Sequence, residues 1–170
     1  MTKPDLNNVN GNFISTGVLS SNWQTEEITD LNETFRNVLN KYILERGIIF
    51  RLDKLPVVNG SQDYVTCLFD TLMSMVFSHP PGNSKLFLYV KCFPETVDSD
   101  VMDLRVNAES TLFKIEIYSN ITTDKNWEIL YQDKLAECSL QATNISGSFS
   151  FSPITNTGCL FSLTLPGKIN

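Results

Sequence analysis

The stretch that decides the fold is Thr157-Gly158-Cys159-Leu160-Phe161-Ser162-Leu163-Thr164-Leu165-Pro166, near the C-terminus. It is an ordinary strand-and-turn pattern, a glycine followed by a run of strand-forming residues. Phe149 and Phe151 begin a similar run just upstream, and Pro153 and Gly158 bracket the loop between the two. The sequence therefore predicts a C-terminal β-hairpin.

Three helices are predicted before this hairpin. Asp30 caps the first, with Glu33 as its capping-box partner, and the apolar residues that follow recur at helical spacing. Ser61 caps the second, which has a broad apolar face and ends at His79-Pro80. The third is indicated by apolar residues three and four apart: Trp127, Leu130, Tyr131, Leu135, Cys138 and Ala142.

Strands are predicted at Ile48 to Leu52, Leu86 to Cys92 and Leu112 to Tyr118, with residues 94 to 109 left undecided. The second of these is apolar at nearly every position, which favours a strand covered on both faces. Leu55-Pro56 with Asn59-Gly60 indicates a turn. Strands with helices between them, closing in a hairpin, predict an α+β fold: a two-layer α/β sandwich whose mixed sheet carries its helices on one face.

Composition and charge narrow the function. The chain has 170 residues, 42% of them hydrophobic, which suits one domain over residues 26–170. Residues 1–25 lack periodicity and are predicted to form a flexible arm. The formal charge of −6 without a Lys/Arg cluster disfavours nucleic acid and anionic membranes as partners. Because no segment approaches the roughly 20 apolar residues of a membrane span, we expect a cytoplasmic protein.

From Asp30 to Lys168 the order of elements resembles the ATP-binding domain of sensor histidine kinases, a Bergerat-type ATPase fold shared with gyrase. Four pieces carry the resemblance in order: the first helix from Asp30, the turn Leu55-Pro56-Val57-Val58-Asn59-Gly60, the helix Leu68-Phe69-Asp70-Thr71-Leu72-Met73-Ser74-Met75-Val76, and the final hairpin. The turn resembles the family's Leu-Pro-x-x-x-Gly motif, and the helix resembles the one that carries its N box. The resemblance implies a site for Mg²⁺ and ATP between that helix and the sheet.

The residues at the implied site depart from the family pattern. The asparagine that coordinates Mg²⁺ in the kinases corresponds to Met75, a soft thioether, and the asparagine before it to Thr71. Where the kinases place an adenine-binding aspartate and glycines after a strand, this chain has Ser119, Asn120 and Ile121.

The length of the segment after Asn120 also departs from the family pattern. About 14 residues separate Asn120 from Leu135, too few for the lid and glycine-rich segment that bind phosphate in this family. The resemblance thus implies a lidless fold with a vestigial cleft, and we expect no cofactor and no metal.

Other catalytic patterns gain little support. His79 is the only histidine, so neither a serine nor a cysteine triad is indicated, and its place at a helix end favours a capping role over phosphoacceptance. Asp98, Asp100 and Asp103 lack the spacing of an EF-hand and are interpreted as a solvated loop. Four scattered cysteines are interpreted as free thiols rather than zinc ligands.

Three hypotheses follow. The first is a noncatalytic regulatory module of two-component signalling that binds a response regulator or a kinase dimerization domain. The second is an enzyme component: a divergent ATP-binding kinase domain working with a separate phosphoacceptor, or a histidine phosphotransferase-like protein. The third is a structural domain outside the family. An apolar, filled cleft between the second helix and the sheet would favour the first, and an open polar cleft the second.

Overall fold

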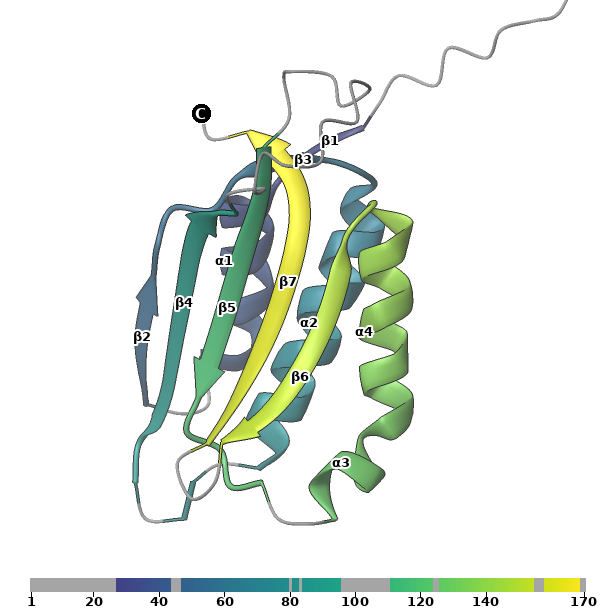
Figure 1. Cartoon of the computed structure of the whole chain (residues 1–170). Coiled ribbons are helices and arrows are strands. Elements are labelled where there is room, and N and C mark those ends of the chain that lie inside the picture. Colours follow the sequence, from purple (N-terminus) through teal and green to yellow (C-terminus); the bar gives the residue numbers. More distant parts are fainter. Residues whose placement is uncertain are drawn as a thin grey trace, which may run out of the picture.

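The described part of the chain forms a seven-stranded sheet with its long helices packed on one face (Figure 1). The computed structural model describes residues 27–43, 47–79, 81–82, 84–95, 111–123, 126–154 and 158–168. The predicted arm and the three loop aspartates lie outside these ranges. The elements, in chain order, are β1 (Ile28–Asp30), α1 (Leu31–Ile43), β2 (Ile48–Leu52), β3 (Val57–Asn59), α2 (Gln62–Ser78), β4 (Leu86–Pro94), β5 (Thr111–Ser119), α3 (Trp127–Leu130), α4 (Gln132–Asn144), β6 (Ser148–Ile154) and β7 (Gly158–Lys168).

The sheet is mixed, as predicted. Its strand order is β1-β3-β7-β5-β4-β2, with β6 also paired to β7. β2 runs parallel to β4, whereas the other pairs are antiparallel. The α+β sandwich with helices on one face is therefore confirmed, and Figure 1 shows α1 and α2 behind the strands and α4 beside β6.

The C-terminal hairpin lies at the centre of this arrangement. β7 pairs with β5 along Cys159 to Gly167 and with β6 along Gly158 to Thr164. Its alternating side chains Cys159, Phe161, Leu163 and Leu165 are buried against the helices. A strand that is paired on both sides and covered on one face needs apolar residues at every second position. The predicted C-terminal hairpin is therefore confirmed.

Both predicted helix caps are present. The Asp30 side chain accepts hydrogen bonds from the backbone N–H groups of Asn32 at 2.8 Å and Glu33 at 3.2 Å. The Ser61 hydroxyl accepts one from Asp63 N–H at 3.3 Å. Each bond satisfies a first-turn N–H that has no partner within its own helix, which fixes where α1 and α2 begin.

Two local predictions are wrong. Val57–Asn59, predicted as part of a turn, is strand β3: Val57 and Val58 pair with Lys168 and Gly167 of β7. Three residues are too few to show a periodicity, so only the distant partner strand makes this segment a strand. The third helix is not continuous either, because the chain leaves helical geometry at Tyr131 (φ −107°, ψ 10°) between α3 and α4.

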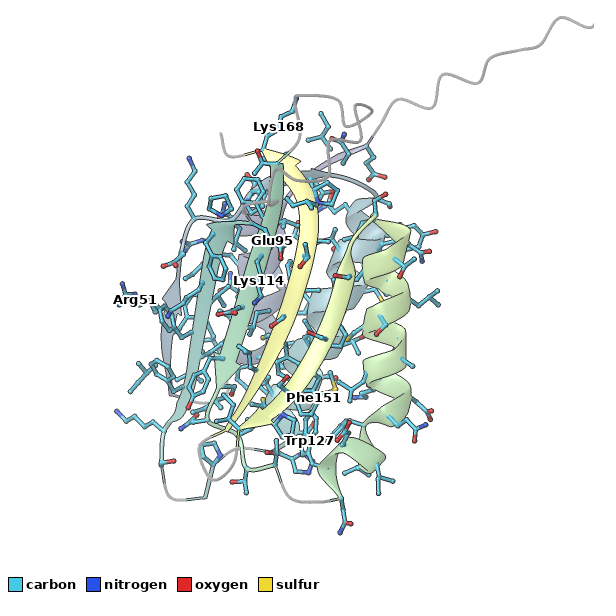
Figure 2. The ribbon with its side chains drawn as sticks, viewed as in Figure 1. Arg51, Glu95, Lys114, Trp127, Phe151 and Lys168 are labelled. Atoms are coloured by element: carbon cyan, nitrogen blue, oxygen red, sulfur yellow. The ribbon has the colours of Figure 1, made fainter. Side chains whose placement is uncertain are left out.

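β4 also differs from its prediction. Leu86, Leu88 and Val90 are buried beneath the helices, but Phe87 and Tyr89 point to the other face, which no described element covers. Figure 2 shows this open face toward the viewer. The apolar run in β4 led to the wrong prediction of two covered faces, because aromatic rings are also tolerated on a half-exposed sheet surface, where they pack on one another and on cations.

The core is one continuous cluster between α1, α2 and the sheet, joined by residues of α3 and α4. Among the helices in the described ranges, none combines the length and apolarity needed to cross a membrane.

Candidate functional site

The candidate site lies where the end of β5, the C-terminal half of α2 and the short helix α3 meet. Figure 2 labels two of its side chains, Trp127 and Phe151, at the lower end of the sheet. Of the residues predicted to outline a vestigial nucleotide cleft, some lie in the hydrophobic core and the others form structural hydrogen bonds.

Three of the five predicted positions are buried. Met75 and Ser119 have no solvent-exposed surface and Ile121 is 1% exposed. Met75 and Ile121 belong to the same hydrophobic cluster, and the Ser119 hydroxyl has no hydrogen-bond partner among the described residues. Met75 and Ser119 therefore fill space in the interior, whereas Ile121 is buried at the wall of a hollow.

Thr71 is half-buried on α2 and takes part in contacts local to that helix. Its backbone carbonyl accepts a hydrogen bond from Ser74 Oγ at 2.8 Å. Thr71 is therefore engaged within α2.

Asn120 holds β4 to the end of β5. Its side-chain carbonyl accepts from Phe87 N–H at 2.6 Å, and its amide donates to the Lys85 carbonyl at 3.0 Å. The Asn120 backbone N–H donates to Phe87 O at 3.4 Å. Both functional groups of this side chain are used in closing the sheet, so its role here is structural.

Replacing Asn120 by alanine should lower the free energy of unfolding by about 1–3 kcal/mol, because it leaves the Phe87 N–H without its acceptor. Urea denaturation measures the change. Asn37→Ala, on the exposed side of α1, is the matched control and should change stability by less than about 0.5 kcal/mol. Equal losses in the two variants would contradict the role assigned to Asn120.

Aromatic side chains from α3, β6 and β7, which the sequence did not assign to the site, form a cluster of their own. Trp127 is 2% exposed and its ring lies 4.8 Å from that of Phe151 and 4.6 Å from that of Tyr131, centroid to centroid. Phe161 of β7 packs on Phe151 at 5.4 Å. The helical spacing of Trp127 and Tyr131 signalled burial, but nothing in the sequence indicated which space they fill.

His79, the C-cap residue of α2, is held by the same cluster. Its Nδ1 lies 2.7 Å from the hydroxyl oxygen of Tyr131, and the two rings meet edge to face at 5.2 Å. The predicted capping role is consistent with this position. One ring nitrogen of the half-buried imidazole is thereby engaged.

The thiols are free, and burial makes them poor ligands. Desolvation raises the pKa of Cys138 and Cys159 to about 12 and that of Cys92 to about 11, so they stay protonated at neutral pH. Within the described ranges no three His, Cys, Asp or Glu side chains are grouped as a metal site would require.

A hollow of about 400 Å³ opens beside the filled region. The loop after β5 forms one wall with Asn120 to Thr123, and Gly82, Ser84 and Gly158 contribute to the others. The Thr123 hydroxyl donates to the Gly158 carbonyl at 3.4 Å across it. This hollow is polar, and none of the described residues that line it is charged.

The comparisons with known proteins identify the fold. The sequence matches no family model and no curated protein sequence. Its structure is similar to the mycobacterial sensor histidine kinase MprB, with a TM-score of 0.64 at 13% identity over 85% of this chain and 99% of that one. It is also similar to the ATP-binding domain of PrrB from Mycobacterium tuberculosis (TM-score 0.55, 16% identity, 82% and 96% covered).

A third similar structure is the catalytic domain of the histidine kinase ThkA, with a TM-score of 0.57 at 14% identity over 85% of this chain and 98% of that one. The class defined by the described elements is thus an α+β sandwich with a mixed sheet. More particularly, the chain has the fold of histidine-kinase ATP-binding domains, which confirms the expected fold.

Proposed function

We propose that the chain is a degenerate histidine-kinase ATPase-like domain, a pseudokinase that acts in the cytoplasm as a noncatalytic, protein-binding module of two-component signalling. Its partner is a response regulator or a kinase dimerization domain. The observation that supports this proposal is the burial of two positions: Met75 and Ile121, which the resemblance assigns to the nucleotide site, are residues of the hydrophobic core.

The chemistry of these positions argues against binding Mg²⁺ with ATP. A hard divalent cation takes oxygen ligands, and Met75 supplies a fully buried thioether. Ile121 supplies no hydrogen-bonding group, and Asn120 already uses both of its own. Opening a cleft here would expose part of the core, which costs roughly 25 cal/mol for each Å² of apolar surface.

Titration with MgATP tests the proposal. We expect no saturable heat by calorimetry and no rise in the thermal midpoint at 1 mM MgATP. For comparison, a ligand present at 100 times its Kd stabilises a protein by about 2.7 kcal/mol, so a site of micromolar affinity would be plain in both measurements. Saturable binding at micromolar concentration would contradict the proposal. Met75→Leu, which keeps the apolar packing, should behave like the parent.

A second candidate function is a divergent ATP-binding kinase domain that works with a separate phosphoacceptor. The observation in its favour is the polar hollow next to Asn120 and Ile121. Thr122 is exposed and lines it, so Thr122→Arg should obstruct the hollow without disturbing the core. MgATP binding that is present in the parent and lost in Thr122→Arg would establish this candidate in place of the first.

The phosphotransferase-like alternative depends on His79. Its imidazole is half-buried and bound to the Tyr131 hydroxyl at 2.7 Å, whereas a phosphoacceptor must be open to its partner. Phosphate transfer to the chain from a phosphorylated response regulator, abolished in His79→Ala, would support that alternative.

A further inference from the structure

The open face of the sheet carries cations gathered over an aromatic ring. The Arg51 guanidinium carbon and the Lys91 ammonium each lie 5.1 Å from the centre of the Tyr89 ring. These three side chains come from the adjacent parallel strands β2 and β4. Figure 2 shows Arg51 at the edge of this face, opposite the side covered by helices.

Lys114, another cation on the same face, differs from these two. Lys114 has a carboxylate at 3.0 Å, that of Glu116. Arg51 and Lys91 are exposed and have no carboxylate within 4.0 Å in the described part of the chain. Two unpaired cations converging on one ring, in a chain of net charge −6, form a local site of attraction for an anion.

An apolar hollow adjoins this pair. It has a volume of about 220 Å³, lies across β4, β5 and the C-terminal hairpin, and is lined by Tyr89, Lys91, Glu116, Tyr118, Ile154 and Leu160. Its size suits one aliphatic or aromatic side chain. Lys91 and Tyr89 belong both to the hollow and to the cation pair, so one short segment can reach both.

We propose that this surface, made of Arg51, Tyr89, Lys91 and the hollow, is the docking site for an acidic segment of the partner protein. A carboxylate of the segment pairs with Arg51 or Lys91, and a neighbouring apolar side chain fills the hollow. The inference rests on the proposed function as a binding module and adds the surface and the chemistry of its partner.

Single-stranded nucleic acid fits the surface less well. Stacking of bases needs uncovered ring faces, and Tyr89 holds two cations of its own chain over its ring. Lys114 lies over Phe93 in the same way, 5.8 Å from the ring centre.

Amide NMR titration of the whole chain tests the proposal with three probes: a blocked hexapeptide of alternating aspartate and leucine, the same peptide with lysine for aspartate, and a ten-nucleotide oligothymidine. We expect shift changes confined to β2, β4, β5, β6 and β7, and sub-millimolar affinity for the acidic peptide only. Equal binding of the lysine peptide, tighter binding of oligothymidine, or no shift changes with the acidic peptide would overturn the proposal.

Two matched charge reversals locate the site. Arg51→Glu should weaken binding of the acidic peptide at least fivefold, whereas Arg36→Glu, at an exposed position of α1, should change it less than twofold. Equal losses would refute the assigned surface. This result does not depend on the MgATP titration. Nucleotide binding would contradict the proposed noncatalytic function, whereas the peptide affinities test the docking surface separately.

Discussion

Replacing Trp127 by alanine should lower the free energy of unfolding by about 3–5 kcal/mol, the range for truncating a buried aromatic side chain to alanine. The indole is 2% exposed and joins α3 to the sheet through Phe151, to which it is stacked at an interplanar angle of 23°. Urea denaturation at constant pH measures the loss. Added indole should restore part of it, because an apolar cavity left by truncation binds a ligand of matching shape.

Two further variants show whether the loss comes from burial of the ring. Trp127→Phe should cost less, since it keeps a ring against Phe151 and removes an indole N–H that has no partner among the described residues. Ile129→Ala, in the same helix but 72% exposed, should change stability by less than about 0.5 kcal/mol. A loss below 1 kcal/mol in Trp127→Ala would show that burial of this ring contributes little to the stability of the fold.

The second large effect is expected from Gly158→Ala, which should also destabilise the fold by roughly 3–5 kcal/mol. Gly158 begins β7 with φ +141°, a backbone conformation that residues with a Cβ rarely adopt. A Cβ there would lie 2.0 Å from the Ser119 carbonyl oxygen and 2.9 Å from Asn120 Cα. Both are backbone atoms at the end of β5, so relief requires moving a paired strand.

Gly82→Ala is the control for this substitution, since Gly82 lines the same polar hollow but a Cβ there would meet nothing within 4 Å. We expect its unfolding midpoint in urea to stay within experimental error of the parent. If Gly158→Ala matched Gly82→Ala, the close approach of β7 to the end of β5 would not be a constraint on the fold.

Local signals in the sequence were enough to predict the long helices and strands. Alternation along Cys159 to Leu165 identified the central strand, and the caps at Asp30 and Ser61 placed the starts of two helices. β3 was missed because a three-residue strand depends on its partner β7. The break at Tyr131 was missed because its position is decided by contacts with Trp127 and His79.

At the candidate site, the sequence showed which residues depart from the pattern of histidine-kinase ATP-binding domains. It did not show what these residues do instead. Met75 and Ile121 were recognisable as apolar from their identity alone, and the structure buries both. The use of Asn120 to close β4 onto β5 was not predictable, because its partners Lys85 and Phe87 are distant in sequence.

The sequence by itself determined the order of the long elements, the caps, the amphipathic faces and the central hairpin, since each depends on the spacing of neighbouring residues. Only the tertiary structure decided that Trp127 is stacked on Phe151 and that one face of the sheet stays open with Arg51 and Lys91 over Tyr89. The physical reason is that these arrangements arise between elements far apart along the chain, where packing and pairing determine contacts that local patterns do not specify.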